Sequence, residues 1–465
     1  MSLPKARFSG RLLIVANRLP VRRARRGGRL VWEPTAGGLV TAMDPILKAH
    51  GGIWVGWTGV AGPAPRPFIH DRVRIKPIAL SAKEVECFYH GFSNATLWPL
   101  FHDAIRTPEF RRQWWRPYLD VNRRFARAAA ALAHSGDLVW VHDYHLLLVP
   151  SMLRQLRPDV RIGFFLHIPF PPEELFAWLP WRTQLLQGLL GADVLGFQTQ
   201  AAAQNFSRLA RRYTSAEGTD AVLDYQNREV RVGAFPISVD FKWFESAARS
   251  ATVARRTAEL RQCIGTSRKI MLAIDRLDYT KGIVARLEAF EELLRSRRVT
   301  VNDCVLIQIA VPSRESVRDY AEMRLRIEQA VGRINGEYSV PGRVAVHYFR
   351  RSFPREELVP YYRAADVMLV TPLRDGMNLV AKEYVATRTD NSGVLVLSEF
   401  TGAAFELRRA LLVNPRDTDG MVSTFEKALT LSRAEARRRM VILRTIVRRH
   451  NVFVWAEDYL GELRR

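Results

Sequence analysis

The chain has 465 residues, a length that exceeds a single hydrophobic core and predicts two domains of about 200–250 residues each. Hydrophobic residues make up 48% and charged residues 25%, as in globular proteins, and no run approaches the ~18 apolar residues that a membrane span requires. The net charge of +23 suggests a nucleic-acid binder, but the arginines are scattered and no zinc finger, RNA-recognition motif or basic zipper is present, so we interpret them as a solvated basic surface that attracts anionic substrates.

The first half of the chain alternates short apolar runs with helical patterns. Residues 11–16 (RLLIVA) predict a buried strand rather than a signal peptide, because the apolar run is short and Asn17 follows it directly. The Arg- and Gly-rich residues 21–34 are interpreted as a mobile flap or hairpin, and residues 35–39 open a helix. Helices are expected within residues 81–128, and further buried strands at residues 53–58, 137–142, 161–166 and 193–197.

The second half repeats this alternation without repeating the sequence. Strands are predicted at residues 269–274, 305–310, 344–349, 367–370, 394–397 and 410–414. Apolar strands that alternate with helices indicate a parallel sheet covered on both faces. We therefore predict an α/β fold of two doubly wound, Rossmann-like domains facing each other across a cleft, the GT-B architecture. The predicted domains are residues 1–236 and 237–450, and a helix in residues 451–465 is expected to cross back to the first domain.

The segment TPLRDGMNLVAKEY, at residues 371–384, predicts a phosphate site. It follows an apolar strand and leads into a helical pattern, which leaves backbone N–H groups and the positive end of a helix dipole facing one spot. Asp375 on the loop can accept hydrogen bonds from sugar hydroxyls. Glu383, about 7–8 Å along the helix, suits the hydroxyls of a ribose. The alternative is an ordinary strand–loop–helix connection with surface carboxylates. The N–H groups are those of Gly376, Met377, Asn378 and Leu379.

Two cations and two histidines also follow predicted strands. Arg276 and Lys281 share one loop, so both can reach the same phosphates, although two surface cations would have the same spacing. His142 and His145 have a spacing that could hold a metal ion, but no further His or Cys cluster supports a site. We therefore predict no metal and interpret His145 as a packing residue. The cysteines are few and widely spaced, which fits a reducing cytoplasm: Cys87, Cys263 and Cys304.

Several segments together resemble the trehalose-6-phosphate synthases, which are retaining enzymes that move glucose from a nucleotide sugar to glucose 6-phosphate. They occur in family order: ANRLP (16–20), AGGL (36–39), GWTG (56–59), FYHGFSNATLWP (88–99), VWVHDYHL (139–146), IGFFLHIPFP (162–171), DRLDYTKG (275–282), TPLRDGMNLVAKEY (371–384) and VLVLSEFTGAA (394–404). The resemblance implies two small-molecule substrates, a nucleoside-diphosphate glucose and glucose 6-phosphate. It implies no cofactor, no nucleic acid and no membrane partner, and we expect a homo-oligomer, either a dimer or a tetramer.

The resemblance also assigns roles to individual residues, and it implies a catalytic set of Arg276, Lys281, Asp143 and His167. The donor site it implies contains Gly38, His167, Arg276, Lys281, Asp375, Gly376, Met377, Asn378, Leu379 and Glu383. The acceptor site it implies contains Arg18, Trp57, Tyr89, Trp98, Asp143 and Arg314, with the two arginines on the phosphate.

The chain departs from the family pattern at Asp275, where Glu is common, and at Ala16, where Ser is common. Neither position is expected to contact phosphate. With no carboxylate nucleophile evident, we expect front-face attack with retention, in which the leaving phosphate oxygen takes the acceptor proton. Three alternatives remain open: a glucosylglycerol-phosphate synthase, a pseudo-glycosyltransferase of the same superfamily, and a catalytically silent sugar-phosphate-binding module. The sequence does not identify the base of the donor nucleotide.

Overall fold

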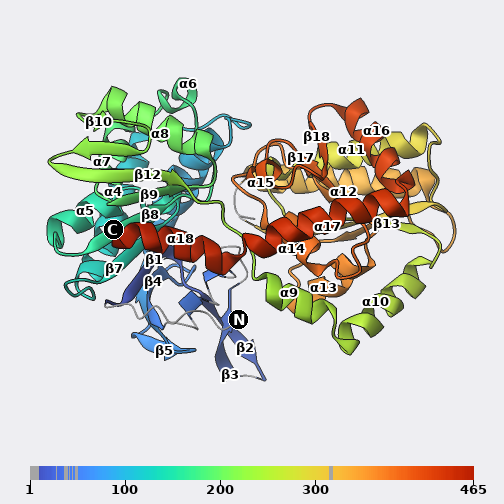
Figure 1. Cartoon of the computed structure of the whole chain (residues 1–465), viewed down its shortest axis with the longest axis horizontal. Helices are drawn as coiled ribbons and strands as arrows, with labels where there is room; N and C mark the ends of the chain where they lie inside the picture. Colours follow the sequence, from blue (N-terminus) through green and yellow to red (C-terminus); the bar gives the residue numbers. More distant parts are fainter. Residues whose placement is uncertain are drawn as a thin grey trace. The chain divides into compact units, whose positions relative to one another are not determined.

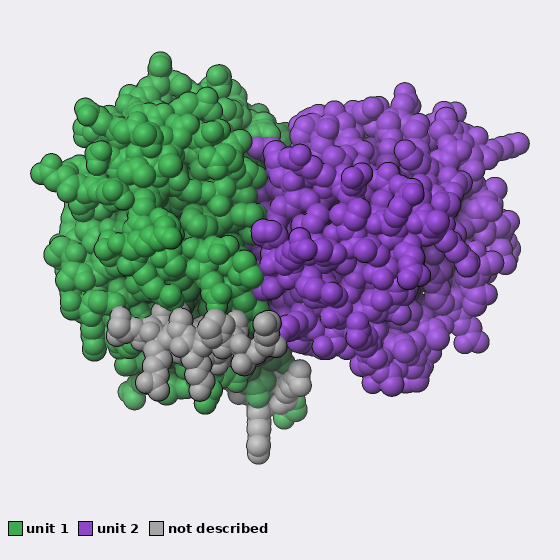
Figure 2. Space-filling model, viewed as in Figure 1, with its two compact units in different colours: residues 1–236, 453–465 green, residues 237–452 purple. Residues whose placement is uncertain are grey.

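The computed structural model of the chain describes residues 10–27, 29–35, 40, 42–43, 46–47, 51–313 and 318–465. The chain forms alternating strands and helices (Figure 1) that group into two compact units. Unit 1 contains residues 1–236 and 453–465, and unit 2 contains residues 237–452 (Figure 2). Two residues predicted to bind substrate, Gly38 and Arg314, lie outside the described residues. No helix in the described part of the chain combines the length and hydropathy of a membrane span.

Unit 1 is built on a sheet with the strand order β10-β11-β12-β9-β8-β7-β1-β4-β6-β5 (Figure 1). The strands from β12 to β6 run parallel, and the outer strands β10, β11 and β5 pair antiparallel with their neighbours. The strands are β1 (Leu12–Arg18), β4 (Gly52–Trp57), β5 (Phe68–His70), β6 (Val73–Ile78), β7 (Leu138–His142), β8 (Arg161–Phe165), β9 (Val194–Phe197), β10 (Glu217–Gly218), β11 (Val222–Tyr225) and β12 (Arg228–Ala234).

A separate antiparallel hairpin, β2 (Val21–Arg26) and β3 (Arg29–Pro34), confirms the hairpin interpretation of residues 21–34. Trp32 of this hairpin stacks on Phe68 of β5, with ring centroids 4.4 Å apart. The helices of unit 1 are α2 (Ala82–Glu84), η1 (Val85–Leu97), α3 (Trp98–Phe101), α4 (Arg112–Ala130), η2 (Tyr144–Leu146), α5 (Val149–Leu156), α6 (Glu173–Phe176), α7 (Arg182–Leu189), α8 (Gln200–Tyr213) and α18 (Val452–Arg464).

The long helix η1 is a π-helix, which the apolar spacing of residues 81–128 did not reveal. Its wider turn is held partly by a side chain, because Asn94 Nδ2 donates to the carbonyl oxygen of Tyr89 at 2.7 Å. Tyr144, which follows β7, donates from its hydroxyl to Asn94 Oδ1 at 2.8 Å. Single-turn π-bulges occur often at functional sites, and a π-helix of this length is rare.

Unit 2 is built on an all-parallel sheet with the order β15-β14-β13-β16-β17-β18. The strands are β13 (Lys269–Arg276), β14 (Cys304–Val311), β15 (Val346–Phe349), β16 (Val367–Val370), β17 (Val394–Ser398) and β18 (Leu411–Val413). The helices are α9 (Phe241–Ala248), α10 (Ala251–Ile264), η3 (Tyr279–Lys281), α11 (Ile283–Arg295), α12 (Arg318–Tyr338), α13 (Arg355–Ala364), α14 (Leu379–Thr387), α15 (Gly402–Glu406), α16 (Thr418–Thr430) and α17 (Arg433–Arg449).

The strand order of unit 2 reverses between β13 and β16, which are neighbours although they are distant in sequence. Ligands of open α/β sheets bind at the carboxyl ends of the strands at such a switch point. The loops that leave β13 and β16 carry the predicted phosphate-binding residues. The strand prediction for unit 2 is therefore confirmed. The structure places the residues of these two loops at the expected edge of the sheet.

Candidate active site

The loop between β16 and α14 presents a row of backbone donors. None of the four successive N–H groups of residues 376–379 donates a hydrogen bond to a described residue. The loop is held by backbone hydrogen bonds to residues 400–403, since Asp375 N donates to Phe400 O at 3.1 Å and Ala403 N donates to Met377 O at 2.9 Å. A Cβ at Gly402 would collide with the carbonyl oxygen of Gly376, so only glycine permits this approach. The four donors at a helix N-terminus suit a phosphate.

Asn378 closes this loop in a strained conformation. Its φ of 84° lies in a region that non-glycine residues rarely adopt. The Oδ1 atom caps α14 by accepting from Ala381 N at 3.2 Å, and Nδ2 donates to Asp375 Oδ2 at 3.0 Å. Strain of this kind persists where the surroundings impose it, which is common in ligand-binding loops.

The two predicted cations lie on the loop after β13. Lys281 Nζ lies 2.6 Å from Asp375 Oδ2, and both side chains are largely buried. Arg276 ends β13, and its guanidinium forms an ion pair with Asp278 at 3.7 Å while 44% of the side chain stays exposed. The structure thus brings Lys281 and Asp375 into contact and leaves Arg276 accessible to an anion.

Arg286 of α11 supports both loops, and sequence reasoning missed it. Its fully buried guanidinium donates to Asp275 Oδ2 at 2.5 Å and to Gln308 Oε1 at 2.8 Å. It also donates to Thr371 Oγ1 at 3.0 Å and to the carbonyl oxygen of Lys281 at 3.3 Å. One side chain therefore joins the end of β13 and the middle of β14 to the loop after β16. Asp275, the position that departs from the family pattern, pairs with this arginine.

Glu383 of α14, the predicted ribose-binding carboxylate, is held by a tyrosine that the sequence did not indicate. Tyr362 of α13 donates from its hydroxyl to Glu383 Oε2 at 2.7 Å. Burial raises the pKa of Glu383, and the hydrogen bond from Tyr362 and the charge of Arg355 oppose that rise.

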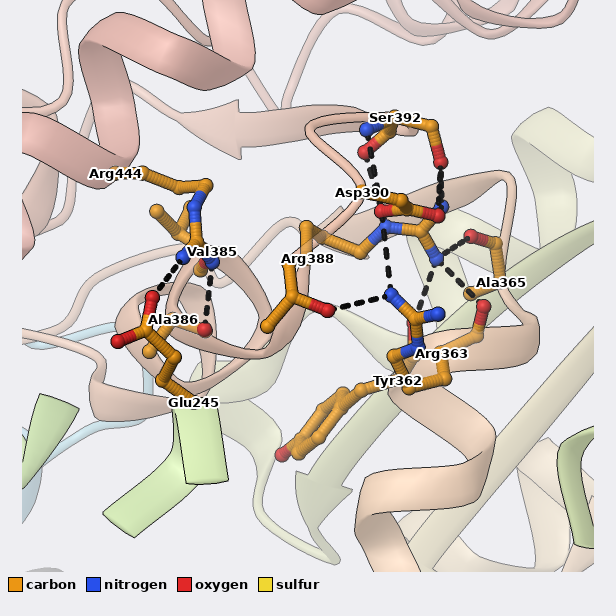
Figure 3. Close-up of polar contacts among 11 residues, drawn as sticks. Glu245, Tyr362, Arg363, Ala365, Val385, Ala386, Arg388, Asp390, Ser392 and Arg444 are labelled. Atoms are coloured by element: carbon orange, nitrogen blue, oxygen red, sulfur yellow. Dashed lines mark hydrogen bonds and ion pairs between the residues drawn. The ribbon is translucent and has the colours of Figure 1, made fainter. Parts of the chain in front are cut away.

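Two arginines cap the helices that carry this pair, as Figure 3 shows. Arg388 donates to the carbonyl oxygens of Tyr362, Arg363 and Ala365 at the end of α13. Arg444 donates to those of Val385 and Ala386 in the last turn of α14 and also to Glu245. Cations at helix C-termini satisfy carbonyls that lack helical partners. Tyr362 and Glu383 are therefore held on two anchored helices.

Arg18 ends β1 in unit 1, and its guanidinium lies against aromatic rings. It lies 4.7 Å from the ring centroid of Trp57 and 5.9 Å from that of Tyr89. A Cβ at Gly59 would collide with the same guanidinium, and partial desolvation lowers the pKa of Arg18. No carboxylate among the described residues forms an ion pair with Arg18. Trp57 is almost fully buried, so its flat face supports this cation.

Asp143 and His167 follow the adjacent strands β7 and β8. Asp143 adopts a φ of 75°, and its Oδ1 accepts from the backbone N of His167 at 3.3 Å. The imidazole of His167 meets that of His142, with His142 Nδ1 3.1 Å from His167 Nε2. The structure thus brings these two predicted residues together and adds His142 to them.

Trp98 and His145 pack in the interior of unit 1. Only 4% of Trp98 is exposed, and its ring lies 4.1 Å from that of His102. His145 stacks on Tyr89 with ring centroids 5.8 Å apart. Within the part of the chain that the structure describes, no three metal-ligating side chains come together.

Comparison with known proteins relates the whole chain to one family. Residues 10–465 match glycosyltransferase family 20. A trehalose-6-phosphate synthase of Mycolicibacterium smegmatis is 52% identical over 461 residues, which are 97% of this chain and 92% of that protein. A solved structure from E. coli bound with UDP-2-fluoro glucose has a TM-score of 0.89 at 36% identity and covers 98% of this chain and 99% of its own. A UDP-forming α,α-trehalose-phosphate synthase from Burkholderia xenovorans in complex with glucose-6-phosphate has a TM-score of 0.90 at 36% identity, with coverages of 98% and 100%.

The fold and the loop systems at the strand ends define a glycosyltransferase of the GT-B type. The chain belongs to glycosyltransferase family 20. The family resemblance and the fold class predicted from the sequence are therefore confirmed.

Proposed function

We propose that this chain transfers glucose from UDP-glucose to glucose 6-phosphate and forms trehalose 6-phosphate and UDP. The observation that carries the proposal is the row of four backbone N–H groups at residues 376–379 beside Lys281. Such a row suits the diphosphate of a nucleotide sugar. The names of the relatives support the choice of substrates, since solved relatives hold UDP-2-fluoro glucose and glucose-6-phosphate.

In this proposal, unit 2 binds the nucleotide sugar. Arg276, Lys281 and the loop amides bind the diphosphate and stabilise the charge that develops as it leaves. Glu383 accepts hydrogen bonds from the ribose hydroxyls, and Tyr362 holds its carboxylate for that task. Asp375 accepts from hydroxyls of the donor glucose. Gly38, in unit 1 and outside the described residues, completes the diphosphate site according to the family resemblance.

Unit 1 binds the sugar-phosphate acceptor. Arg18 is a cation held among aromatic rings, without a carboxylate partner in the described residues, and it suits the acceptor phosphate. Asp143 accepts from acceptor hydroxyls, and Trp57 and Tyr89 lie beside the guanidinium of Arg18. Trp98 is assigned to the acceptor site on the family resemblance alone. Arg314 is proposed as the second phosphate ligand on the family resemblance alone.

The glucose keeps its anomeric configuration. The anomeric hydroxyl of the acceptor attacks from the face that the diphosphate leaves, the C1–O bond to the diphosphate breaks, and the leaving phosphate oxygen takes the proton. His167 contacts the donor glucose, so Arg276, Lys281, Asp143 and His167 form the catalytic set. The proposal also includes action in the cytoplasm and assembly into a homo-oligomer. Light scattering measures the molar mass and so tests the oligomeric state.

Calorimetric titration of UDP and of glucose 6-phosphate against the unmodified chain, Lys281→Met and Arg18→Met tests these assignments. Lys281→Met is expected to weaken UDP binding about tenfold or more and to leave glucose 6-phosphate binding unchanged. Arg18→Met is expected to show the opposite pattern. Equal losses of both ligands in both variants, or no loss in either, would contradict the assignment of donor and acceptor.

A further inference from the structure

The imidazoles of His142 and His167 share one hydrogen bond. His142 is the last residue of β7, and it lies beside Phe165 of β8 in the register of the two strands. Its Nδ1 lies 3.1 Å from Nε2 of His167. Two ring nitrogens at this distance form a hydrogen bond only if one carries a proton and the other a lone pair.

The other nitrogen of His142 shows which way this bond runs. The ring is 0% exposed, and its Nε2 meets no hydrogen-bond partner among the described residues. Aromatic rings surround the imidazole: its centroid lies 4.7 Å from the ring centroid of Trp140 and 6.5 Å from that of Phe165. A proton on Nε2 would be a buried N–H without an acceptor, which is rarer in proteins than a lone pair without a donor. The proton of His142 therefore belongs on Nδ1.

Both rings are neutral, so the tautomer of one determines that of the other. Burial lowers the pKa of His167 to about 3, and burial and the neighbouring His167 lower the pKa of His142 well below its usual range. With His142 donating from Nδ1, His167 accepts at Nε2 and must carry its own proton on Nδ1. No described residue accepts a hydrogen bond from His167 Nδ1.

We propose that His142 is a positioning residue that fixes His167 as the Nδ1–H tautomer, so that His167 offers a hydrogen-bond donor to an oxygen of the bound sugar. The inference deepens the proposed function and rests on it for the identity of the ligand. A donor-only His167 binds a sugar oxygen that has a free lone pair, and it discriminates against a deoxy sugar at that position. His142, which the sequence first suggested as a metal ligand, thereby acts through His167.

The test uses the full chain with ¹⁵N-labelled histidine and two variants. His142→Phe keeps a ring of similar size and removes the donor, whereas His142→Asn places an amide near the position of Nδ1 and can restore it. Long-range ¹H–¹⁵N spectra distinguish protonated from bare ring nitrogens, and a His167→Gln spectrum assigns the signals of His167. Steady-state kinetics with UDP-glucose and titration with UDP, which lacks the sugar, complete the set.

In the unmodified chain we expect His167 to carry its proton on Nδ1. In His142→Phe the dominant tautomer of His167 should carry no proton on Nδ1, and in His142→Asn the Nδ1–H tautomer should dominate again. The KM for UDP-glucose should rise about tenfold in His142→Phe and recover in His142→Asn, with UDP affinity unchanged throughout. A proton on Nε2 of His167 in the unmodified chain would overturn the inference, and so would an unchanged tautomer in His142→Phe. The spectra need no substrate, so they test the tautomer of His167 independently of the proposed function. Failure of the proposed function would instead appear as no turnover by the unmodified chain. If His142→Phe does not fold, the spectrum of the unmodified chain decides alone.

Discussion

Lys281 Nζ lies 2.6 Å from Asp375 Oδ2, so the loop after β13 and the loop after β16 are joined by an ion pair at the switch point of the unit 2 sheet. The family resemblance gave these residues separate tasks, one on the diphosphate and one on the sugar. Their contact means that each also fixes the position of the other. Removing one leaves the other as a largely buried charge without this partner.

Substitution of Asp375 should separate sugar recognition from diphosphate recognition. Asp375→Asn keeps the shape of the loop, and we expect UDP affinity to change by less than about fivefold while kcat/KM for UDP-glucose falls about 100-fold or more. Lys269→Met is the matched control, because Lys269 lies at the far end of β13 with 50% of its side chain exposed. Equal losses of UDP and UDP-glucose recognition in Asp375→Asn would argue against a sugar-binding role.

Arg276→Ala should lower kcat by about 100-fold or more, because a cation that meets the developing phosphate charge acts mainly in the transition state. Its exposed position predicts little change in thermal stability. Arg295→Ala provides the control, since Arg295 is an exposed arginine on α11 that pairs with Glu292. If kcat stays within about twofold of the unmodified value, Arg276 does not stabilise the leaving group.

Tyr362→Phe should weaken recognition of the ribose. The variant removes the hydroxyl that donates to Glu383, so that carboxylate loses its fixed orientation and its pKa rises further. We expect the preference for UDP over 2′-deoxy-UDP to fall about three- to tenfold in competition binding. The neighbouring Tyr361→Phe is the control and should keep the full preference. Equal preferences in both variants would show that Tyr362 does not position the ribose ligand.

Arg286→Met should destabilise the protein, because it leaves the buried carboxylate of Asp275 without its ion-pair partner. Breaking a buried ion pair from one side costs about 3–5 kcal/mol, whereas replacing both partners can be nearly neutral. We therefore expect the double variant Asp275→Asn/Arg286→Met to recover part of the free energy of unfolding. Urea unfolding measures both, and a double variant no more stable than Arg286→Met would contradict this account.

Stability should fall in mild acid because of His142. Burial lowers its pKa in the folded protein well below the ordinary value of 6.5, so the unfolded chain binds more protons below pH 6.5. The contribution of His142 is present above pH 6.5 and is lost as the pH falls, by about 1.4 kcal/mol at pH 5.5. His142→Phe should therefore lose less stability than the unmodified chain between pH 7.5 and 5.5. Equal losses on thermal unfolding would show that this histidine is not kept neutral.

The strands and the loop between β16 and α14 could be predicted from the sequence because their signals are local. Apolar runs such as residues 367–370 and the Gly-containing segment that follows them carry the information within a few positions. The partners that orient the site are not local. Tyr362 lies 21 positions from Glu383, His142 lies 25 from His167, and Arg286 lies 85 from Thr371. Only the packing of the elements brings these pairs together.

The helical part of unit 1 shows a second limit of prediction from the sequence. Apolar spacing indicated helices within residues 81–128, but it did not separate an α-helix from the π-helix at Val85–Leu97. The wider turn depends on the hydrogen bonds of Asn94 to Tyr89 and Tyr144, and the second partner comes from another part of the chain.

Identification of the reaction product tests most directly whether the chain transfers glucose from UDP-glucose to glucose 6-phosphate. The unmodified chain is incubated with UDP-, GDP- or ADP-glucose and with glucose 6-phosphate or glycerol 3-phosphate, and the products are identified by mass and anomeric NMR signals. We predict release of UDP with glucose 6-phosphate and a phosphorylated, non-reducing α,α-linked disaccharide. Turnover with glycerol 3-phosphate alone, or no turnover with any pair, would contradict the account.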